Sequence, residues 1–374
     1  MSGPLAGVRV VELGGIGPGP FCGMVLGDLG AEVIRVDRPA EAGRRSVPPV
    51  LHRNRRSIAV DLKDPAGAQA VLSLVDSCDA LFEGFRPGVA ERLGLGPKEC
   101  LERNPRLVYG RMTGWGQDGP MGQDPGHDVN YIGLTGALHA IGPAGADPVV
   151  PINLIGDFGG GGMLMAVGIL SALVAARTSG RGQVVDAAMV DGSALLLAMT
   201  YGFLGQGLWT DERGVNLLDG GAPFYGVYRC SDGRHVAVGA LEPQFYAALV
   251  RVLGLADDPA FAAQHDRYRW PAMRARLTAL FAERSRDEWA GVFAGQGACV
   301  TPVLSLTEAV SHPHIVARDV FLGDPPAPAP APRFSGTPSV QPSPAPVIGS
   351  DTRSVLSDAG VTNLDDLYAR GVVA

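Results

Sequence analysis

The first half of the chain alternates short β-branched runs with longer segments whose apolar residues repeat every three to four positions. The β-branched runs predict strands at 8–13, 31–37, 57–62, 80–83 and 107–112. Helical patterns cover 21–30, 66–78, 126–136, 163–177 and 190–206. A strand, a turn, a helix and a second strand in this order form a βαβ unit, so we expect an α/β fold built on a parallel sheet.

The pattern changes after Gly220. Runs at 224–230 and 235–240 predict a hairpin, and amphipathic helices are expected at 244–253, 270–282 and 286–295. We therefore expect a large Rossmann-like domain at 1–205, a linker at 206–223 and a smaller α+β domain at 224–320. The remainder, 321–374, begins with a Pro-rich extended stretch at 325–346. Its helical pattern at 351–367 is expected to pack on the large domain.

Two uncharged stretches, 158–176 and 192–210, are long enough to cross a bilayer. Both contain several glycines and neither is flanked by clustered Lys or Arg, so core or interface helices explain them better. The N-terminus lacks the pattern of a signal peptide, and the final GVVA is not a peroxisomal signal. The five scattered Cys form no CxxC pair, so a cytoplasmic location is expected.

Composition narrows the class of protein further. With 46% hydrophobic residues and a net charge of −7, the chain is neither disordered nor suited to nucleic acid. Charged residues make up only 18%, against a typical ~25%. This shortage suggests that part of the surface is buried in an oligomer.

The turn at 14–20, GGIGPGP, is the first candidate for ligand binding. It lies between a strand and a helix, and Asp37 ends the next strand, as in dinucleotide-binding proteins. However, Pro20 replaces the third glycine of G-x-G-x-x-G, and Pro18 has no amide to donate to a phosphate. A Rossmann-like scaffold without NAD is the better reading.

Basic residues follow several of the expected strands. Arg38, Lys63 and Arg86 come at strand ends, where ligands of parallel sheets bind. The sequence HRNRRS adds three more arginines, Arg53, Arg55 and Arg56, just before a strand. Together they suggest a ligand with adenine and phosphates, although ordinary surface charge explains any one of them equally well.

His127 and Asp157 are the next candidate site residues. Asp157 comes shortly before four consecutive glycines, at the expected N-cap of a long helix. Free amides there could stabilise an enolate oxygen, and the glycines would let a ligand approach the backbone. The alternative is a plain capping Asp and a structural His. Neither H-x-x-x-H nor G-x-S-x-G occurs, so no metal site or serine hydrolase is indicated.

Several segments together are similar to one family. The opening VRVVELGGIGPGPFCGMVLGDLGAEVIRVDRP, with SIAVDLK, GFRPG, GHDVNYIGLTGAL, PINLIGDFGGGG and VGALEPQFY, resembles the family III CoA-transferases (CaiB/BaiF), in particular their α-methylacyl-CoA racemase branch. The resemblance implies an interlocked homodimer that acts on an acyl-CoA thioester in lipid or fatty acid metabolism, with no metal or separate cofactor. It also implies no nucleic acid and no membrane partner.

The resemblance further implies a mechanism. His127 and Asp157 would flank the α-carbon of a 2-methylacyl-CoA, one removing the α-proton and the other protonating the opposite face of the enolate. Glu242 would position His127 from the small domain of the other subunit. The implied CoA contacts are Ile16, Arg38, Val60, Asp61, Leu62, Lys63, Gly84, Arg86, Arg92, Gly126, Asp128, Asn130 and Tyr131.

Two alternatives stay open. In a CoA-transferase, the carboxylate of Asp157 would be a nucleophile that forms a mixed anhydride with the acyl group. The presence of His127 favours the racemase, because the transferases generally lack a His there. A catalytically silent CoA-binding protein would have no need of His127, Asp157 and Glu242 together. The acyl chain is left open.

Overall fold

The computed structural model describes residues 3–338 and 341–374, which form two compact units. Unit 1 consists of Met1–Thr135, Pro151–Leu197 and Leu322–Ala374. Unit 2 consists of Gly136–Val150 and Ala198–Phe321. The large unit is therefore assembled from three separate stretches of chain.

Unit 1 is built on a six-stranded parallel sheet of order β3-β2-β1-β4-β5-β6. Its strands are β1 (Arg9–Leu13), β2 (Glu32–Asp37), β3 (Arg55–Ala59), β4 (Ala80–Glu83), β5 (Val108–Thr113) and β6 (Gln183–Ala188). The order reverses between β1 and β4, as in the doubly wound dinucleotide-binding fold. The expected parallel α/β sheet is confirmed. Its sixth strand, β6, was not predicted from the sequence.

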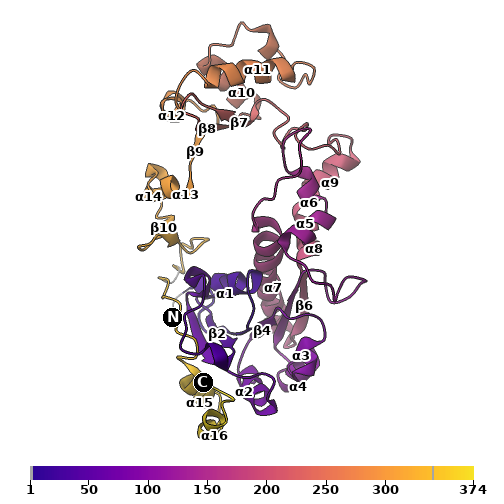
Figure 1. Ribbon diagram of the computed structural model, residues 1–374, viewed down its shortest axis with the longest axis vertical. Helices are drawn as coiled ribbons and strands as arrows, with labels where there is room; N and C mark the ends of the chain where they lie inside the picture. Colours follow the sequence, from indigo (N-terminus) through magenta and orange to yellow (C-terminus); the bar gives the residue numbers. More distant parts are fainter. Residues whose placement is uncertain (1–2, 339–340) are drawn as a thin grey trace. The chain divides into compact units, whose positions relative to one another are not determined.

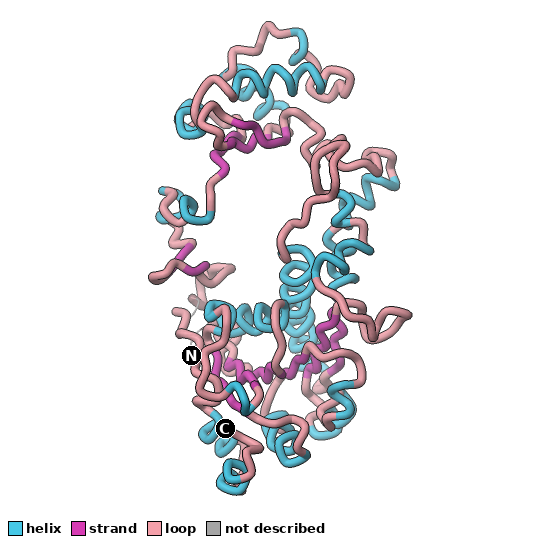
Figure 2. Tube along the Cα trace, in the orientation of Figure 1, coloured by secondary structure: helices cyan, strands magenta, loops and turns pink. Residues whose placement is uncertain are grey.

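Helices cover both faces of this sheet (Figures 1 and 2). One layer contains α1 (Pro18–Asp28) and α7 (Leu164–Ser179), and the other contains α2 (Pro65–Val75), α4 (Pro97–Arg103), α15 (Thr352–Asp358) and α16 (Leu364–Ala369). Side chains alternate between the layers along a strand, so Val10 packs with α1 and α7 whereas Val11 packs with α2. Both faces are thus buried, which explains the nearly continuous apolar character of the strands.

The glycine-rich stretch before α7 forms a π-helix, η3 (Leu154–Met163), which continues into α7 without a break. Leu154–Ser179 is long and apolar enough to cross a membrane, with a mean hydropathy of 1.9. Its buried face, which includes Met165 and Ile169, belongs to the core beneath the sheet. The second uncharged stretch is not one helix but two, α8 (Met189–Leu196) and α9 (Ala198–Gly205).

The end of the chain closes one edge of the sheet. The amide of Ala59 in β3 donates to Oγ1 of Thr352, and the amide of Ala374 donates to the carbonyl of Ala59 at 3.1 Å. Leu356 and Leu367 are buried against α2 and the strands. The otherwise unpaired edge of β3 is therefore satisfied by residues that lie some three hundred positions later.

Unit 2 contains an antiparallel sheet of order β7-β8-β9: β7 (Tyr225–Arg229), β8 (His235–Gly239) and β9 (Val300–Val303). Helices α10 (Pro243–Val252), α11 (Trp270–Phe281) and α12 (Arg286–Phe293) complete it. Its core is aromatic, with Phe281 touching Tyr228, Trp289 and Phe293. The predicted hairpin and the three predicted helices are present, and β9 was missed.

The remaining elements are short. They are η1 (Pro39–Glu41), η2 (Pro49–His52), α3 (Val89–Arg92), α5 (Asp128–Leu134), α6 (Ala137–Ala140), η4 (Pro259–Phe261), α13 (Leu306–Ala309), α14 (Pro313–Ala317), β10 (Phe321–Leu322) and β11 (Ala327–Pro328). Of the Pro-rich stretch at 325–346, residues 339 and 340 lie outside the described residues. The rest has turns, bends and irregular stretches around the short strand β11.

Candidate active site

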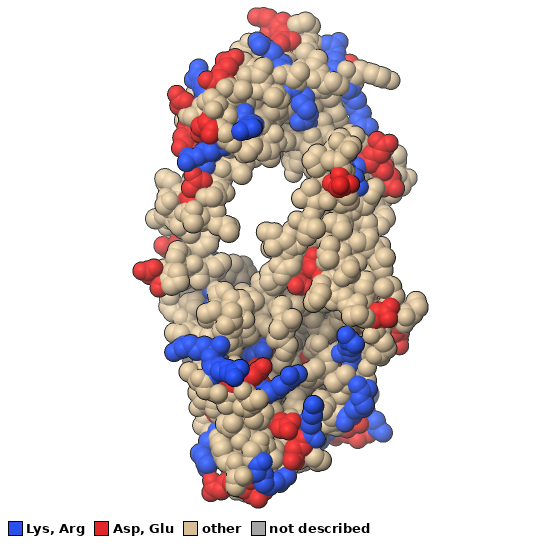
Figure 3. Space-filling view, in the orientation of Figure 1, with Lys and Arg blue, Asp and Glu red and all other residues tan. Residues whose placement is uncertain are grey.

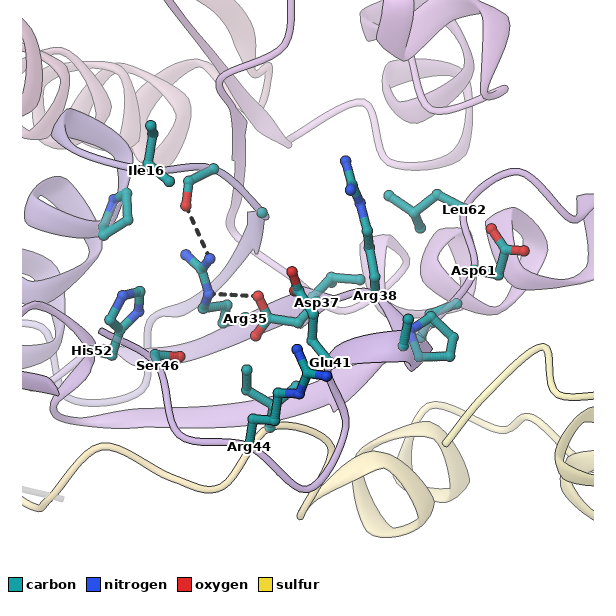
Figure 4. Close-up of a pocket in the computed structure, with 18 of the residues that line it drawn as sticks. Ile16, Arg35, Asp37, Arg38, Glu41, Arg44, Ser46, His52, Asp61 and Leu62 are labelled. Atoms are coloured by element: carbon teal, nitrogen blue, oxygen red, sulfur yellow. Dashed lines mark hydrogen bonds and ion pairs between the residues drawn. The ribbon is translucent and has the colours of Figure 1, made fainter. Parts of the chain in front are cut away.

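A cavity of about 1060 Å³ opens at the carboxyl ends of β1, β2 and β3. Its wall comes from the turn after β1, the segment that follows β2 and the residues directly after β3 (Figure 4). This is the edge at which parallel sheets bind their ligands. Lys and Arg side chains, with Asp and Glu among them, are visible on the face of unit 1 shown in Figure 3. The cavity wall combines basic residues such as Arg38 and Lys63 with apolar residues such as Phe85 and Leu93.

The structure brings only part of the predicted CoA-binding set to this cavity. The predicted residues in its wall are Ile16, Arg38, Val60, Asp61, Leu62 and Lys63. The predicted residues outside it are Gly84, Arg86, Arg92, Gly126, Asp128, Asn130 and Tyr131. Three further arginines, Arg35, Arg44 and Arg45, line the cavity and were missed. In the sequence, Arg44 and Arg45 stand out only as an adjacent pair. η1 and the loop after it bring both residues over the carboxyl ends of the strands.

The arginines of HRNRRS do not line the cavity, and each pairs with a carboxylate, so they are not part of this candidate nucleotide site. Arg53 is 6% exposed and pairs with Asp28, while Arg55 is 6% exposed and pairs with Glu12 at 3.0 Å. Arg56 pairs with Glu32. Arg55 and Arg56 begin β3 and Arg53 lies just before it, and the guanidinium groups serve as counter-ions for carboxylates of neighbouring elements.

A buried ionic cluster lies beneath the cavity. The carboxylate of Glu12, fully buried in β1, is shared by Arg35 and Arg55. Burial alone would raise the pKa of Glu12, but the two guanidinium groups lower it below its usual value. At Asp37 burial is the larger effect and its pKa is raised, although Arg35 opposes the shift.

Asp157 is not an N-cap, which corrects the sequence prediction. The helical segment begins earlier, after Asn153, and Asp157 lies in the first turn of the π-helix η3. Its Oδ2 accepts a hydrogen bond from Nδ2 of Asn153 at 3.0 Å. Gly156 and the four glycines that follow Phe158 permit this rare helix, a form that often occurs at functional sites.

The backbone of Asp157 is held by a second carboxylate. Its amide donates to Oδ2 of Asp128 at 2.7 Å, and Oδ1 of Asp128 is buried without a hydrogen-bond partner. A side chain at Gly156 would collide with Asp128, so glycine is required there for the contact. The amide of Asp157 is therefore not free to stabilise an enolate oxygen, contrary to the expectation from sequence.

His127 lies next to this carboxylate pair, at the start of α5. Its backbone amide donates to Oδ1 of Asn130 at 3.0 Å, which anchors the loop at the helix N-terminus. The imidazole is exposed, and it is close enough to Asp157 to act on the pKa of its carboxyl. The hydroxyl of Tyr131 donates to the carbonyl of Gly126 and fixes the same loop from below.

The electrostatics around Asp157 favour its protonated form. Burial raises the pKa of Asp157, and the neighbouring charge of Asp128 raises it further. The hydrogen bond from Asn153 and the nearby His127 oppose this shift without cancelling it. A carboxyl with a raised pKa can both accept and return a proton closer to neutral pH than an ordinary Asp.

The loop that carries Arg86 is anchored by a separate buried carboxylate. Glu83, 1% exposed, accepts hydrogen bonds from the amide of Phe85 at 2.6 Å and from Nε of Arg111 at 3.1 Å. Burial raises the pKa of Glu83 to about 7. The exposed Arg86 acts on the pKa of Tyr131, so the loop lies on the same side of the unit as α5.

Glu242 belongs to unit 2. It is the exposed N-cap residue of α10, followed by Pro243, and its charge acts on the thiol of Cys299. Its predicted role toward His127 stays a prediction. Within the described residues, 3–338 and 341–374, no group of three or more His, Cys, Asp or Glu could hold a metal ion.

Comparison with known proteins shows the family of this chain. The CoA-transferase family III model matches residues 5–352. Alpha-methylacyl-CoA racemase of Mus musculus is 46% identical over 95% of this chain and 93% of its own length, and that of Homo sapiens is 44% identical over 97% and 95%. A solved CaiB/BaiF family protein from Brucella suis is 27% identical, with a TM-score of 0.82 over 96% of this chain and 100% of its own. This chain belongs to CoA-transferase family III.

Proposed function

We propose that this protein is a racemase that interconverts (R)- and (S)-2-methylacyl-CoA thioesters. The observation that carries the proposal is the pairing of Asp157, half-buried and with a raised pKa, with the imidazole of His127 beside it. Inversion at a carbon needs one proton-transfer group on each face, and each group must change protonation near neutral pH. The two relatives of highest identity reported above carry the same activity in their names.

The proposed reaction begins with one group, Asp157 or His127, taking the α-proton as the C–H bond breaks. The electron pair of that bond forms the C=C bond of an enolate, and the thioester oxygen becomes negative. The other group then donates its proton to the opposite face of the α-carbon, which restores the thioester with inverted configuration. The thioester itself acidifies the α-proton, so the proposal includes no metal or cofactor, and CoA is part of the substrate.

The basic cavity supports the CoA half of the proposal. Arg38, Lys63 and Arg44 supply positive charge to its wall, which suits the phosphates of the nucleotide, and the apolar wall suits the adenine. Arg86, whose charge acts on Tyr131, would contact the pantetheine or pyrophosphate. The remaining predicted contacts around α5 would hold the thioester end.

The assembly and setting of the enzyme are part of the proposal. An interlocked homodimer would place Glu242 of the partner subunit near His127, where it would position the imidazole. The low share of charged residues, 18%, fits a chain that buries extra surface between subunits. The enzyme would act in the cytoplasm on branched acyl chains of lipid and fatty acid metabolism.

Solvent exchange tests the activity. The protein is incubated in D₂O with (R)- and, separately, (S)-2-methylacyl-CoA, and deuterium at the α-carbon and configuration are followed. The racemase incorporates one deuterium and brings both samples to the same mixture, while Asp157→Ala does not. Asp124→Asn, in an exposed position near His127, is the matched control and keeps the activity. An unlabelled product of unchanged configuration would contradict the proposal.

The family also contains CoA-transferases, in which Asp157 would attack the thioester carbonyl and form a mixed anhydride with release of CoA. Incubating the protein with a free carboxylic acid and an acyl-CoA labelled in its CoA distinguishes the racemase from the transferase reaction. Transfer of CoA to the free acid without α-deuteration would indicate the transferase. Deuteration without transfer indicates the racemase.

A further inference from the structure

Arg35 lines the cavity, and its guanidinium donates hydrogen bonds to three partners. Nη1 donates to Oε1 of Glu12 at 2.5 Å, and Nε donates to Oδ1 of Asp37 at 2.9 Å. Nη2 donates to the carbonyl of Gly15 at 3.0 Å (Figure 4). The first two partners are charged, whereas the third belongs to the turn Gly14–Gly17, which we call the glycine loop.

The glycine loop needs external contacts to hold one conformation. Gly14, Gly15 and Gly17 all have positive φ, at 33°, 111° and 68°, and such residues lose much entropy when ordered. Arg35 holds the loop at Gly15, and Arg55 holds the start of α1 by donating to the carbonyl of Pro20 at 2.6 Å. Glu12 binds both arginines, so one buried carboxylate fixes both anchors of the loop.

The other side of the glycine loop lies beside the candidate catalytic carboxylate. A methyl group added to Gly17 would lie 3.3 Å from Oδ2 of Asp157. Directly after the loop, the ring of Phe21 packs on Phe158 with ring centroids 4.8 Å apart. The loop and the start of α1 thus form the wall against which the first turns of η3 rest.

We propose that Arg35 is a positioning residue for Asp157, which it holds in place through the glycine loop. The exposed Ile16 of this loop and Arg35 both line the cavity, so a nucleotide bound there contacts the loop directly. Binding of the CoA nucleotide therefore orders the loop and, through Gly17, the carboxylate. The catalytic meaning of this contact rests on the proposed function, whereas the contact itself can be tested without it.

Hydrogen exchange followed by mass spectrometry tests the contact. Arg35→Lys keeps the positive charge, but an ammonium cannot reach Glu12, Asp37 and Gly15 together. We expect exchange about threefold faster or more in peptides that cover 14–20 and 153–163. Arg56→Lys, on the neighbouring strand and paired with Glu32, is the matched control and changes neither peptide. In the wild type, free CoA slows exchange in both peptides. Unchanged exchange at 153–163 in Arg35→Lys overturns the proposal.

A second pair of variants tests the same contact from the loop. Gly17→Ala crowds Asp157 and strains a positive φ, while nothing lies within 4 Å of a methyl group at Gly19. We expect Gly17→Ala to lower kcat about tenfold and leave KM for the acyl-CoA nearly unchanged, with Gly19→Ala like the wild type. Equal kcat in the two variants contradicts the proposal. A wild type that exchanges no α-proton contradicts the proposed function instead, and the hydrogen-exchange result then decides on Arg35.

Discussion

The backbone amide of Asp157 donates to the carboxylate of Asp128 at 2.7 Å, although Asp157 itself carries the candidate catalytic carboxyl. Two acidic side chains are therefore held close together by the main chain. Their repulsion adds to the burial that raises the pKa of Asp157. Asp128 is thus both a structural acceptor and an electrostatic neighbour.

This relationship predicts a shift in pH dependence. Asp128→Asn keeps an oxygen to accept from the Asp157 amide but removes the negative charge. Because that charge raises the pKa of Asp157, its loss lowers the pKa, and Asp157 becomes able to accept a proton at lower pH. The acid limb of kcat/KM should move to lower pH, as measured with the stereoisomer that Asp157 deprotonates. A limb that moves upward or stays in place would show that Asp128 does not act on Asp157.

His127 and Asp157 should be separable by stereochemistry. His127→Ala removes one of the two proton-transfer groups, so racemisation should fall by about 10²-fold or more. One stereoisomer should still exchange its α-proton with D₂O, because Asp157 faces only one side of the enolate. The measurement is deuterium incorporation into each stereoisomer separately. Residual exchange of both stereoisomers at equal rates would contradict the assignment of one group to each face.

The cavity should bind the nucleotide rather than the acyl chain. Replacing Arg44 or Lys63 with Gln should raise KM for acyl-CoA by about tenfold with kcat nearly unchanged, because each loses one charged contact to a phosphate. The ratio of variant to wild-type KM should be the same for substrates with shorter acyl chains. Arg103→Gln is the matched control, since Arg103 pairs with Asp76 at the surface and does not line the cavity. An equal rise in KM for Arg103→Gln would contradict the assignment of the nucleotide to this cavity.

The arginines of HRNRRS should affect stability and not binding. Arg53→Gln removes the ion pair of the buried Asp28 and leaves it the hydrogen bond from Asn54, so the free energy of unfolding should fall by about 3 kcal/mol. Arg56→Gln, whose ion pairs are partly exposed, should cost less than about 1 kcal/mol. Urea unfolding measures both. KM for acyl-CoA should be the same in both variants as in the wild type, and a raised KM in Arg53→Gln would reopen its role as a ligand contact.

Much of unit 1 could be predicted from the sequence because its central strands are buried on both faces. Runs such as VRVVEL have few polar positions, and their spacing with helices leaves a parallel sheet as the natural arrangement. β6 was missed because QVVDAA does not alternate apolar and polar residues, and most of its residues lie outside the core. β9 was missed because Pro302 interrupts a short strand at the edge of its sheet.

The types of residue at the site could be predicted from the sequence, whereas their contacts and exact positions could be predicted only in part. His127 and Asp157 lie in one neighbourhood, and Arg38 and Lys63 line one cavity, as their positions after strands indicated. The partners of Arg53 and Arg55 could not be foreseen, because Asp28 and Glu12 come from elements far away along the chain. The place of Asp157 in its helix was also hidden, since a run of glycines does not reveal where a π-helix begins.

The closure of β3 by the last residues of the chain has a consequence for synthesis on the ribosome. β1 to β6 are complete by residue 188, yet the amides of Ser57 and Ala59 find their acceptors only on Asp351 and Thr352. The larger part of unit 2, Ala198–Phe321, is translated in between. A nascent chain therefore exposes an open sheet edge for most of its synthesis, the kind of surface that pairs with other chains. Chaperone demand and co-translational aggregation should consequently depend on how quickly residues 198–350 are made.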